Sequence, residues 1–212
     1  DITPRELTAV WTAAGKVYDA SATAQVSATS TDVLAGDVGA LGISGSGVFA
    51  AGKNAGTGKT VTIGGGFLTG AERNNYVLLN PTGTALADIA QRALTPSYSG
   101  GTRVYDGGSA APVTASLAGV LSGDQLSFGQ TAVFSAGKDV GNGKAISITG
   151  IVIAGTDAAN YRLTTDTAST TGSITPKPIT VAGLGAVSAT NRVYDGTTVV
   201  SVTVPTGVTL TP

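Results

Sequence analysis

The sequence lacks histidine, cysteine and methionine, and only 12% of its 212 residues are charged, against roughly 25% in ordinary globular proteins. Without histidine or cysteine there is no zinc finger, thiolate cluster, haem ligand, Ser-His-Asp triad or Cys-His dyad. Without disulfides, each domain must be held together by its own packed core. These absences leave structural and binding roles as the main classes to consider.

Charge and hydropathy exclude two further classes. The 12 basic and 13 acidic residues nearly balance, which argues against a surface that follows nucleic-acid phosphates. No apolar run approaches the ~20 residues that span a bilayer, so we expect no membrane insertion. Because the chain has no methionine, we expect it to be a fragment of a longer protein or a processed product. A signal peptide outside this segment is compatible with that expectation.

The chain repeats itself, which is the strongest pattern in the sequence. Val-Tyr-Asp occurs three times, and its tyrosines are spaced 87 and 89 residues apart. Other landmarks return at nearly the same offset: Gly36-Asp37 and Gly123-Asp124, Phe49 and Phe134, Ala51-Gly52-Lys53 and Ala136-Gly137-Lys138, Asn75-Tyr76 and Asn160-Tyr161. The joints Ile2-Thr3-Pro4-Arg5, Ile89-Ala90-Gln91-Arg92 and Ile174-Thr175-Pro176-Lys177 also correspond. We therefore predict repeat units at 1–88 and 89–173, and a truncated third unit at 174–212.

Each unit has a strand-like pattern. Residues 59–63 and 144–148 alternate polar and apolar side chains, as half-buried strands do, and glycine clusters separate the strands. Residues 85–92 are expected to form a strand that leads into the joint. The pattern predicts an all-β chain of small antiparallel β-sandwich-like (Ig-like) domains in an elongated array. β-grasp-like units with one short helix are the alternative. The third unit is too short to bury a core, so we expect it to be poorly ordered or to pair with unit two.

Aromatic residues recur in register and are expected to anchor the two cores. Trp11 corresponds to Tyr98, Phe49 to Phe134 and Tyr76 to Tyr161. Each buried aromatic ring removes about 150–250 Å² from water. An exposed aromatic ring would instead stack on a sugar, and for that role Trp11, Tyr98 and Tyr18 are the first candidates.

The most distinctive motif is Tyr-Asp-Gly, and a turn is its simplest interpretation. The three copies are Tyr18-Asp19-Ala20, Tyr105-Asp106-Gly107 and Tyr194-Asp195-Gly196. An Asp carboxylate accepts backbone N–H bonds in such turns, and glycine permits a positive φ. The alanine in the first copy suggests that no positive φ is needed there. A calcium site remains an alternative, although one carboxylate per turn provides few ligands for an ion that takes six to eight oxygens.

Candidate catalytic motifs are weak, and we expect no enzyme activity and no cofactor. Gly58-Lys59-Thr60 resembles a phosphate-binding loop, but Lys53 stands where that loop needs glycine. A glycosidase needs two carboxylates in one cleft. Here the carboxylates recur once per unit at matching positions, as a structural role predicts: Asp19 and Asp106, Asp37 and Asp124, Glu72 and Asp157.

One covalent possibility is an intramolecular isopeptide bond. A lysine, an asparagine and a carboxyl group recur in both units, and the candidate bonds are Lys59–Asn75 and Lys144–Asn160. The simpler interpretation is an exposed lysine at a strand end and an asparagine in a turn. Intact mass distinguishes the two, because each bond removes one ammonia.

The order of the motifs resembles the YDG-type tandem repeats of large secreted bacterial adhesins of the filamentous-haemagglutinin kind. The best matches are Arg103–Gly107, Ala158–Leu163 and Ile174–Pro178, while Ala20 and Ala90-Gln91 depart from the pattern. The resemblance implies structural spacer repeats, secreted or attached to the bacterial surface, that project a distal binding region and carry no catalytic residues. The alternative is a glycan- or host-protein-binding module. Its partners would be a host-surface glycan or protein, or other adhesin copies, and the fragment is expected to be monomeric.

Overall fold

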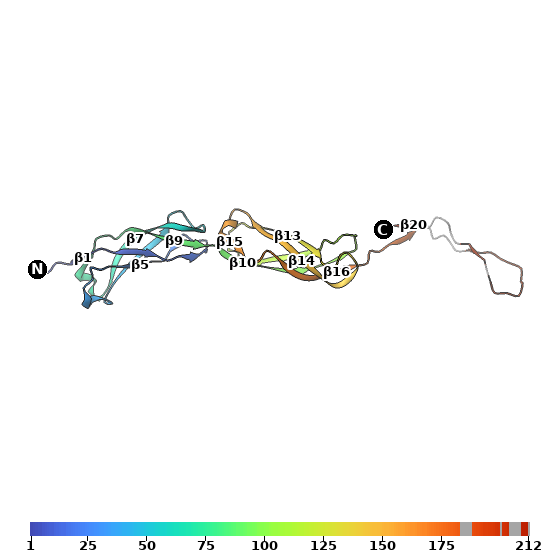
Figure 1. The fold of residues 1–212 in the computed structure, drawn as a ribbon, viewed down its shortest axis with the longest axis horizontal. Coiled ribbons are helices and arrows are strands. Elements are labelled where there is room, and N and C mark those ends of the chain that lie inside the picture. Colours follow the sequence, from blue (N-terminus) through green and yellow to red (C-terminus); the bar gives the residue numbers. More distant parts are fainter. Residues whose placement is uncertain (183–187, 200, 204–208, 212) are drawn as a thin grey trace. The chain divides into compact units, whose positions relative to one another are not determined.

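The chain is nearly all β. A computed structural model describes residues 1–182, 188–199, 201–203 and 209–211 (Figure 1). The helical elements in these ranges are three 3-10 turns: η1 (Ala35–Asp37), η2 (Ala71–Asn75) and η3 (Ala158–Asn160). The all-β prediction is confirmed, whereas the β-grasp-like alternative needs a helix that the described residues lack. No helix in the described part of the chain is long and apolar enough to cross a membrane.

The first repeat folds into one five-stranded sheet and two strand pairs. Its strands are β1 (Arg5–Leu7), β2 (Val10–Ala13), β3 (Lys16–Val17), β4 (Thr23–Ala24), β5 (Val26–Thr29), β6 (Leu41–Phe49), β7 (Gly56–Gly70), β8 (Tyr76–Leu78) and β9 (Gly83–Ala90). The five-stranded sheet has the order β3-β9-β7-β6-β4. β1 pairs with β8 in parallel, and β2 pairs with β5 antiparallel.

The second repeat uses the same pairings. Its strands are β10 (Arg92–Gly100), β11 (Thr102–Val104), β12 (Val113–Ala118), β13 (Ser127–Phe134), β14 (Gly141–Ala154), β15 (Tyr161–Leu163) and β16 (Ala168–Thr175). They form sheets of order β12-β10-β15 and β11-β16-β14-β13. The parallel pair Arg92↔Tyr161 repeats the pair Arg5↔Tyr76 of the first repeat. The same sequence pattern therefore gives the same register.

The central strands follow the predicted alternation. In β7, Val61 and Ile63 are fully buried while Thr60 and Thr62 between and beside them are exposed. In β14, Ile146 and Ile148 are buried in the same way. The recurring anchors Phe49, Phe134, Tyr76 and Tyr161 are buried too, as their register predicts. Alternation along one strand is enough to assign a buried face because side chains have a period of two.

The last strand of each repeat runs beyond the predicted unit boundary. β9 continues to Ala90, and there it pairs in parallel with β3. Ile89 is only 2% exposed, and Ile174 at the end of β16 is only 1% exposed. Both isoleucines therefore belong to the core of the repeat that precedes them. The predicted strand from residue 85 into the joint is confirmed.

The segment after the second repeat forms short strand pairs. β17 (Thr180–Ala182) pairs antiparallel with β20 (Thr209–Thr211), and β18 (Ser188–Ala189) with β19 (Val202–Thr203). Among the described residues, the strands of this segment pair with one another, and the expected pairing with unit two is not seen. The expectation for residues 183–187, 200, 204–208 and 212 lies outside the described residues.

The residues group into two compact units. The first contains Asp1–Tyr98, Ala115–Thr131 and Ile148–Ala168, and the second contains Ser99–Thr114, Ala132–Ser147 and Ser169–Pro212. The core of the first unit combines Tyr18 and Phe49 of the first repeat with Leu94 and Tyr161 of the second. The joint between the two repeats therefore lies inside the first unit.

Candidate functional site

The aspartate of each Tyr-Asp-Gly motif closes its own turn. Asp19 Oδ1 accepts a hydrogen bond from Ser21 N at 2.9 Å and pairs with Lys16 Nζ at 2.7 Å. Asp106 and Asp195 make the equivalent bonds with the backbone N–H two residues on and with an arginine three residues before. The Lys16 hydrogen bond lowers the pKa of Asp19. These carboxylates are thus held as anions within their own loops.

The residue after this aspartate has a positive φ in all three copies. Gly107 and Gly196 have φ values of 84° and 76°, and Ala20 has a φ of 63°. The expectation that the alanine copy avoids this conformation is wrong. The turn geometry is imposed by the aspartate's hydrogen bonds, so Ala20 is held in a left-handed region that alanine normally avoids.

The tyrosine of the first motif is buried at the joint between the repeats. Tyr18 N donates to Ala90 O at 2.9 Å, which attaches the motif to the last strand of its own repeat. The Tyr18 ring meets the Tyr161 ring edge to face, with centroids 5.4 Å apart and planes at 75°. Such aromatic pairs add about 0.5–1.5 kcal/mol beyond the area they bury.

Asp124 is the centre of a charged cluster beside these rings. Tyr161 OH donates to Asp124 Oδ2 at 2.6 Å, and Leu121 N donates to the same hydroxyl oxygen at 3.0 Å. Lys53 Nζ, from the first repeat, pairs with Asp124 Oδ1 at 3.1 Å. The Asp124 side chain is only 1% exposed, so this ion pair joins the two repeats through a buried carboxylate.

The local pKa shifts follow from these contacts. The hydrogen bond from Tyr161 lowers the pKa of Asp124, and Lys53 lowers it further. The neighbouring Tyr18 hydroxyl and Asp124 carboxylate raise the pKa of Lys53. Burial raises the pKa of both Tyr18 and Tyr161. The Tyr18 hydroxyl is buried without a hydrogen bond of standard geometry, although it lies close to Lys53 and Asp124.

An asparagine completes the joint. Asn160 is 3% exposed, and its Oδ1 accepts a hydrogen bond from Ala55 N at 2.8 Å. Its Nδ2 donates to Asn54 Oδ1 at 3.2 Å. A buried amide is stable when its polar atoms are paired, and here the partners come from the other repeat. We call this group the junction: Tyr18, Lys53, Asn54, Ala55, Asp124, Asn160 and Tyr161.

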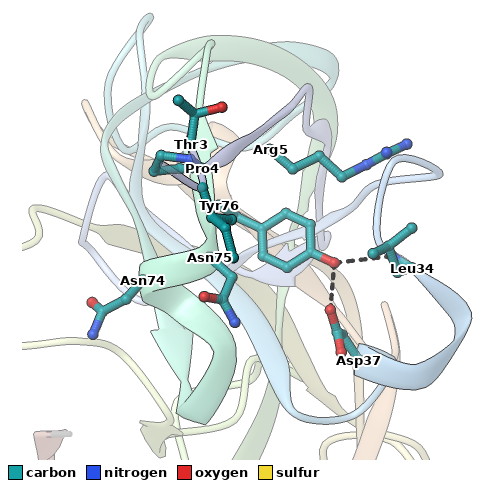
Figure 2. Close-up of a pocket in the computed structure, with 9 residues that line it drawn as sticks. Thr3, Pro4, Arg5, Leu34, Asp37, Asn74, Asn75 and Tyr76 are labelled. Atoms are coloured by element: carbon teal, nitrogen blue, oxygen red, sulfur yellow. Dashed lines mark hydrogen bonds between the residues drawn. The ribbon is translucent and has the colours of Figure 1, made fainter.

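The first repeat holds the same cluster in an open form at its other end. Tyr76 OH donates to Asp37 Oδ2 at 2.6 Å, and Leu34 N donates to the Tyr76 hydroxyl at 3.1 Å (Figure 2). These are the contacts of Tyr161, Asp124 and Leu121 in the second repeat. Here they border a cavity of about 510 Å³, lined by Ile2, Thr3, Pro4, Arg5, Leu34, Asp37, Asn74, Asn75 and Tyr76.

Of the three aromatic ligand candidates, Trp11 and Tyr18 are buried and Tyr98 is half-buried. Trp11 is 9% exposed, and its indole N–H donates to Asn80 O at 3.2 Å. Its ring packs so closely on strand glycines that a Cβ at Gly45, Gly66 or Gly83 would lie 2.9 Å or less from ring or backbone atoms. Tyr98 is half-buried and stacks on Phe128 with centroids 6.0 Å apart. The Trp11 ring therefore lacks an open face of the kind that sugar stacking requires.

The isopeptide hypothesis does not fit the structure. Lys59 lies near the start of β7, while Asn75 follows the other end of that strand. The eleven residue steps from Lys59 to Gly70 span roughly 35 Å at ~3.3 Å per residue, far beyond bonding distance. Asn75 Nδ2 instead donates to Glu72 Oε2 at 2.6 Å. Asn160 makes the hydrogen bonds of the junction.

The carboxylates considered for catalysis or metal binding are dispersed. Asp157 Oδ2 accepts a bond from Gln125 N at 2.9 Å, which fixes a turn of its own repeat. Asp37 and Asp124 each pair with a tyrosine hydroxyl. Among the described residues, no three His, Cys, Asp or Glu side chains group as a metal site would need.

The junction unites motifs that the sequence showed as separate landmarks. Tyr18 comes from Tyr-Asp-Gly, Lys53 from Ala-Gly-Lys and Asp124 from Gly-Asp, while Asn160 and Tyr161 form Asn-Tyr. Sequence reasoning found each motif but not their meeting point. Their shared recurrence was the available signal, because residues repeated together are explained by one repeated contact. Asn54 and Ala55 carried no such signal, since the second repeat has Asp139 and Val140 in their places.

The fold and the junction define a class of protein: all-β tandem repeats whose recurring side chains join one repeat to the next. The chain matches the YDG domain twice, over residues 3–85 and again over residues 90–169, and it belongs to the YDG domain family. A search of curated proteins found no match to the chain. A search of solved structures found none either.

Proposed function

We propose that the chain is a spacer segment of a secreted or surface-attached bacterial adhesin, in which YDG repeats hold a distal binding region away from the cell. The role is non-catalytic. The observation that supports it is that the repeated motifs meet at the junction, where their polar atoms bond to the neighbouring repeat. A spacer needs such joints, because a repeat array is held together mainly by contacts between neighbours.

The chemistry of the junction suits a joint that must keep its geometry. It combines an ion pair with a buried carboxylate, an edge-to-face tyrosine pair and a buried asparagine. The asparagine side chain both accepts and donates a hydrogen bond across the joint. Each contact is directional, so together they specify one orientation. The strand β9 also runs straight into the joint, and only Gln91 separates it from β10. The alternative binding function has less support, because Trp11 is buried.

Small-angle X-ray scattering of the chain tests this proposal. A compact 212-residue globule would have a radius of gyration of about 17 Å. A spacer of two repeats placed end to end should exceed about 25 Å, given strands of 14 and 15 residues at ~3.3 Å each. A concentration-independent value above that limit is expected. A value near the compact limit would contradict the spacer function.

Two matched alanine substitutions test whether the junction holds the two repeats in place. Asp124→Ala removes the centre of the junction, whereas Asp37→Ala removes its counterpart at the other end of the first repeat. The spacer proposal expects Asp124→Ala to broaden the distribution of interatomic distances and Asp37→Ala to leave it unchanged. Equal effects of the two substitutions would show that the junction does not hold the joint.

A further inference from the structure

The open end of the first repeat has the geometry of the occupied junction. Tyr76, Asp37 and Leu34 reproduce the hydrogen bonds of Tyr161, Asp124 and Leu121 to within about 0.1 Å. In the second repeat these groups receive Tyr18 and Lys53 of the preceding repeat. In the first repeat the same groups border an open cavity (Figure 2). A site with matching donors and acceptors should accept a matching partner.

The carboxylate at this end also lacks a cationic partner among the described residues. Asp124 has a lysine partner at 3.1 Å, whereas Asp37 makes no ion pair among the described residues. Asn75 lies at the position of Asn160, whose side-chain oxygen receives a backbone N–H from the neighbouring repeat. The Asn75 amide nitrogen is bonded to Glu72, and the described residues provide its oxygen with no donor. The end therefore presents a carboxylate and an amide oxygen to a partner that carries an ammonium group and a free N–H.

A second, independent observation concerns Ile2. Its equivalents Ile89 and Ile174 are 2% and 1% exposed. Each of these lies in the last strand of the preceding repeat, paired in parallel with the strand before Tyr-Asp-Gly. Ile2 and Thr3 thus stand at positions that, in the other two copies of the joint, belong to the last strand of the preceding repeat.

We propose that the open end of the first repeat is the socket for a further YDG repeat joined in front of Asp1. Ile2 and Thr3 would complete the last strand of that repeat. Its tyrosine and lysine, equivalent to Tyr18 and Lys53, would pack on Tyr76 and pair with Asp37. This inference extends the proposed function and rests on it only in treating the repeats as links of one array.

An extended chain tests the proposal. A second copy of residues 1–87 is fused in front of Asp1, which reproduces the spacing of the existing joint because Asp1 corresponds to Asp88. A parallel extension uses residues 88–172, which supply Tyr105 and Lys138. Hydrogen exchange is measured at the backbone amides of residues 2–5 in the original and both extended chains. Protection of these amides should rise by about 100-fold or more in the extended chains.

Two substitutions test whether Asp37 makes the contact that protects the amides of residues 2–5. Asp37→Asn should reduce the new protection at least about 10-fold in the extended chains and leave the original chain unaffected. Asp139→Asn, made in the original part of each chain and not in the added copy, makes the same charge change at an exposed position outside the pocket and should change neither. The emission of the added Trp11 reports whether the first extension is folded.

Two results would overturn the inference. One is unchanged exchange of residues 2–5 in either folded extension. The other is self-association of the original chain that Asp37→Asn abolishes, because the socket would then belong to a second copy. Unchanged exchange leaves the scattering of the original chain as it is, and self-association makes that scattering depend on concentration. A failure of the spacer function instead gives a compact radius of gyration at every concentration, so the two failures are distinct.

Discussion

Asp124 and Asp37 occupy matching positions in the two repeats but have different neighbours. Both accept a hydrogen bond from a tyrosine hydroxyl at 2.6 Å. Only Asp124 also pairs with a lysine, and its side chain is almost fully buried. Removing one member of a buried pair leaves the other charge without compensation. The same substitution should therefore have unequal effects at the two sites.

Asp124→Asn should lower the free energy of unfolding by about 2 kcal/mol, because Lys53 loses its partner but stays partly solvated. Asp37→Asn should lower it by less than about 1 kcal/mol, since only the bond from Tyr76 changes. Urea unfolding of the two variants measures the difference. Equal losses would mean that the ion pair across the junction contributes nothing.

Ala20→Gly should stabilise the chain. Ala20 has a φ of 63°, a region that glycine enters without steric penalty. The gain should be about 0.5–1 kcal/mol after the larger entropy loss of glycine on folding is subtracted. The urea midpoint measures it, and Gly107→Ala in the second repeat should show the opposite sign. A loss of stability in Ala20→Gly would show that the alanine side chain makes a packing contact of greater value.

The titratable groups of the junction predict a stability that falls at both pH extremes. The pKa of Asp124 is lowered on folding, so its contribution is present above about pH 4 and is lost as the pH falls. The pKa values of Tyr161 and Lys53 are raised, so their contributions are present below about pH 10 and are lost as the pH rises. Urea midpoints should be flat from about pH 5 to 9. Asp124→Asn should weaken the acid dependence, and an unchanged acid limb would contradict the assignment.

At the scale of elements, the strand that ends one repeat is the component that enters the joint. β9 carries Ile89 into the core of the first repeat and then passes through Gln91 to β10. β10 begins with the residues that pair in parallel with β15, beside Tyr161. The covalent connection between the repeats is thus two strand ends joined through Gln91, while the side chains of the junction come mostly from turns. A substitution in this strand should affect the repeat before it.

Ile89→Ala should lower the free energy of unfolding by about 2–4 kcal/mol, because it deletes buried methyl and methylene groups. Ile2→Ala makes the same chemical change at an equivalent position that is fully exposed, and it should have an effect within about 0.5 kcal/mol. Thermal or urea unfolding compares the two variants. A similar loss from both would mean that Ile2 is not free in solution.

The sequence allowed the strands and anchors to be predicted better than the contacts between repeats. Alternation identified the buried faces around Val61 and Ile146, since that signal is local. The Lys53–Asp124 pair joins residues 71 apart in the sequence, and no local period reports such a contact. Motif spacing puts the unit boundary at residue 88, whereas hydrogen bonding carries β9 on to Ala90. Residue type alone argues against a positive φ at Ala20, but the hydrogen bonds of Asp19 outweigh that preference.

At the scale of the whole chain, the two repeats share one set of motifs, and the structure gives those motifs a common place. Most residues of the junction belong to recurring motifs, and they come from both repeats. An array built this way needs only one kind of joint, repeated along its length.

A double-mutant cycle between Lys53 and Asp124 tests most directly that the recurring motifs form the joint between repeats. Lys53→Ala, Asp124→Ala and the double variant are unfolded in urea, with Lys138 and Asp37 as a control pair that has matching residue types but no contact in this chain. We predict a coupling free energy of about 1 kcal/mol or more for Lys53 and Asp124, and additivity within about 0.5 kcal/mol for the control pair. Additivity in both pairs would contradict the account.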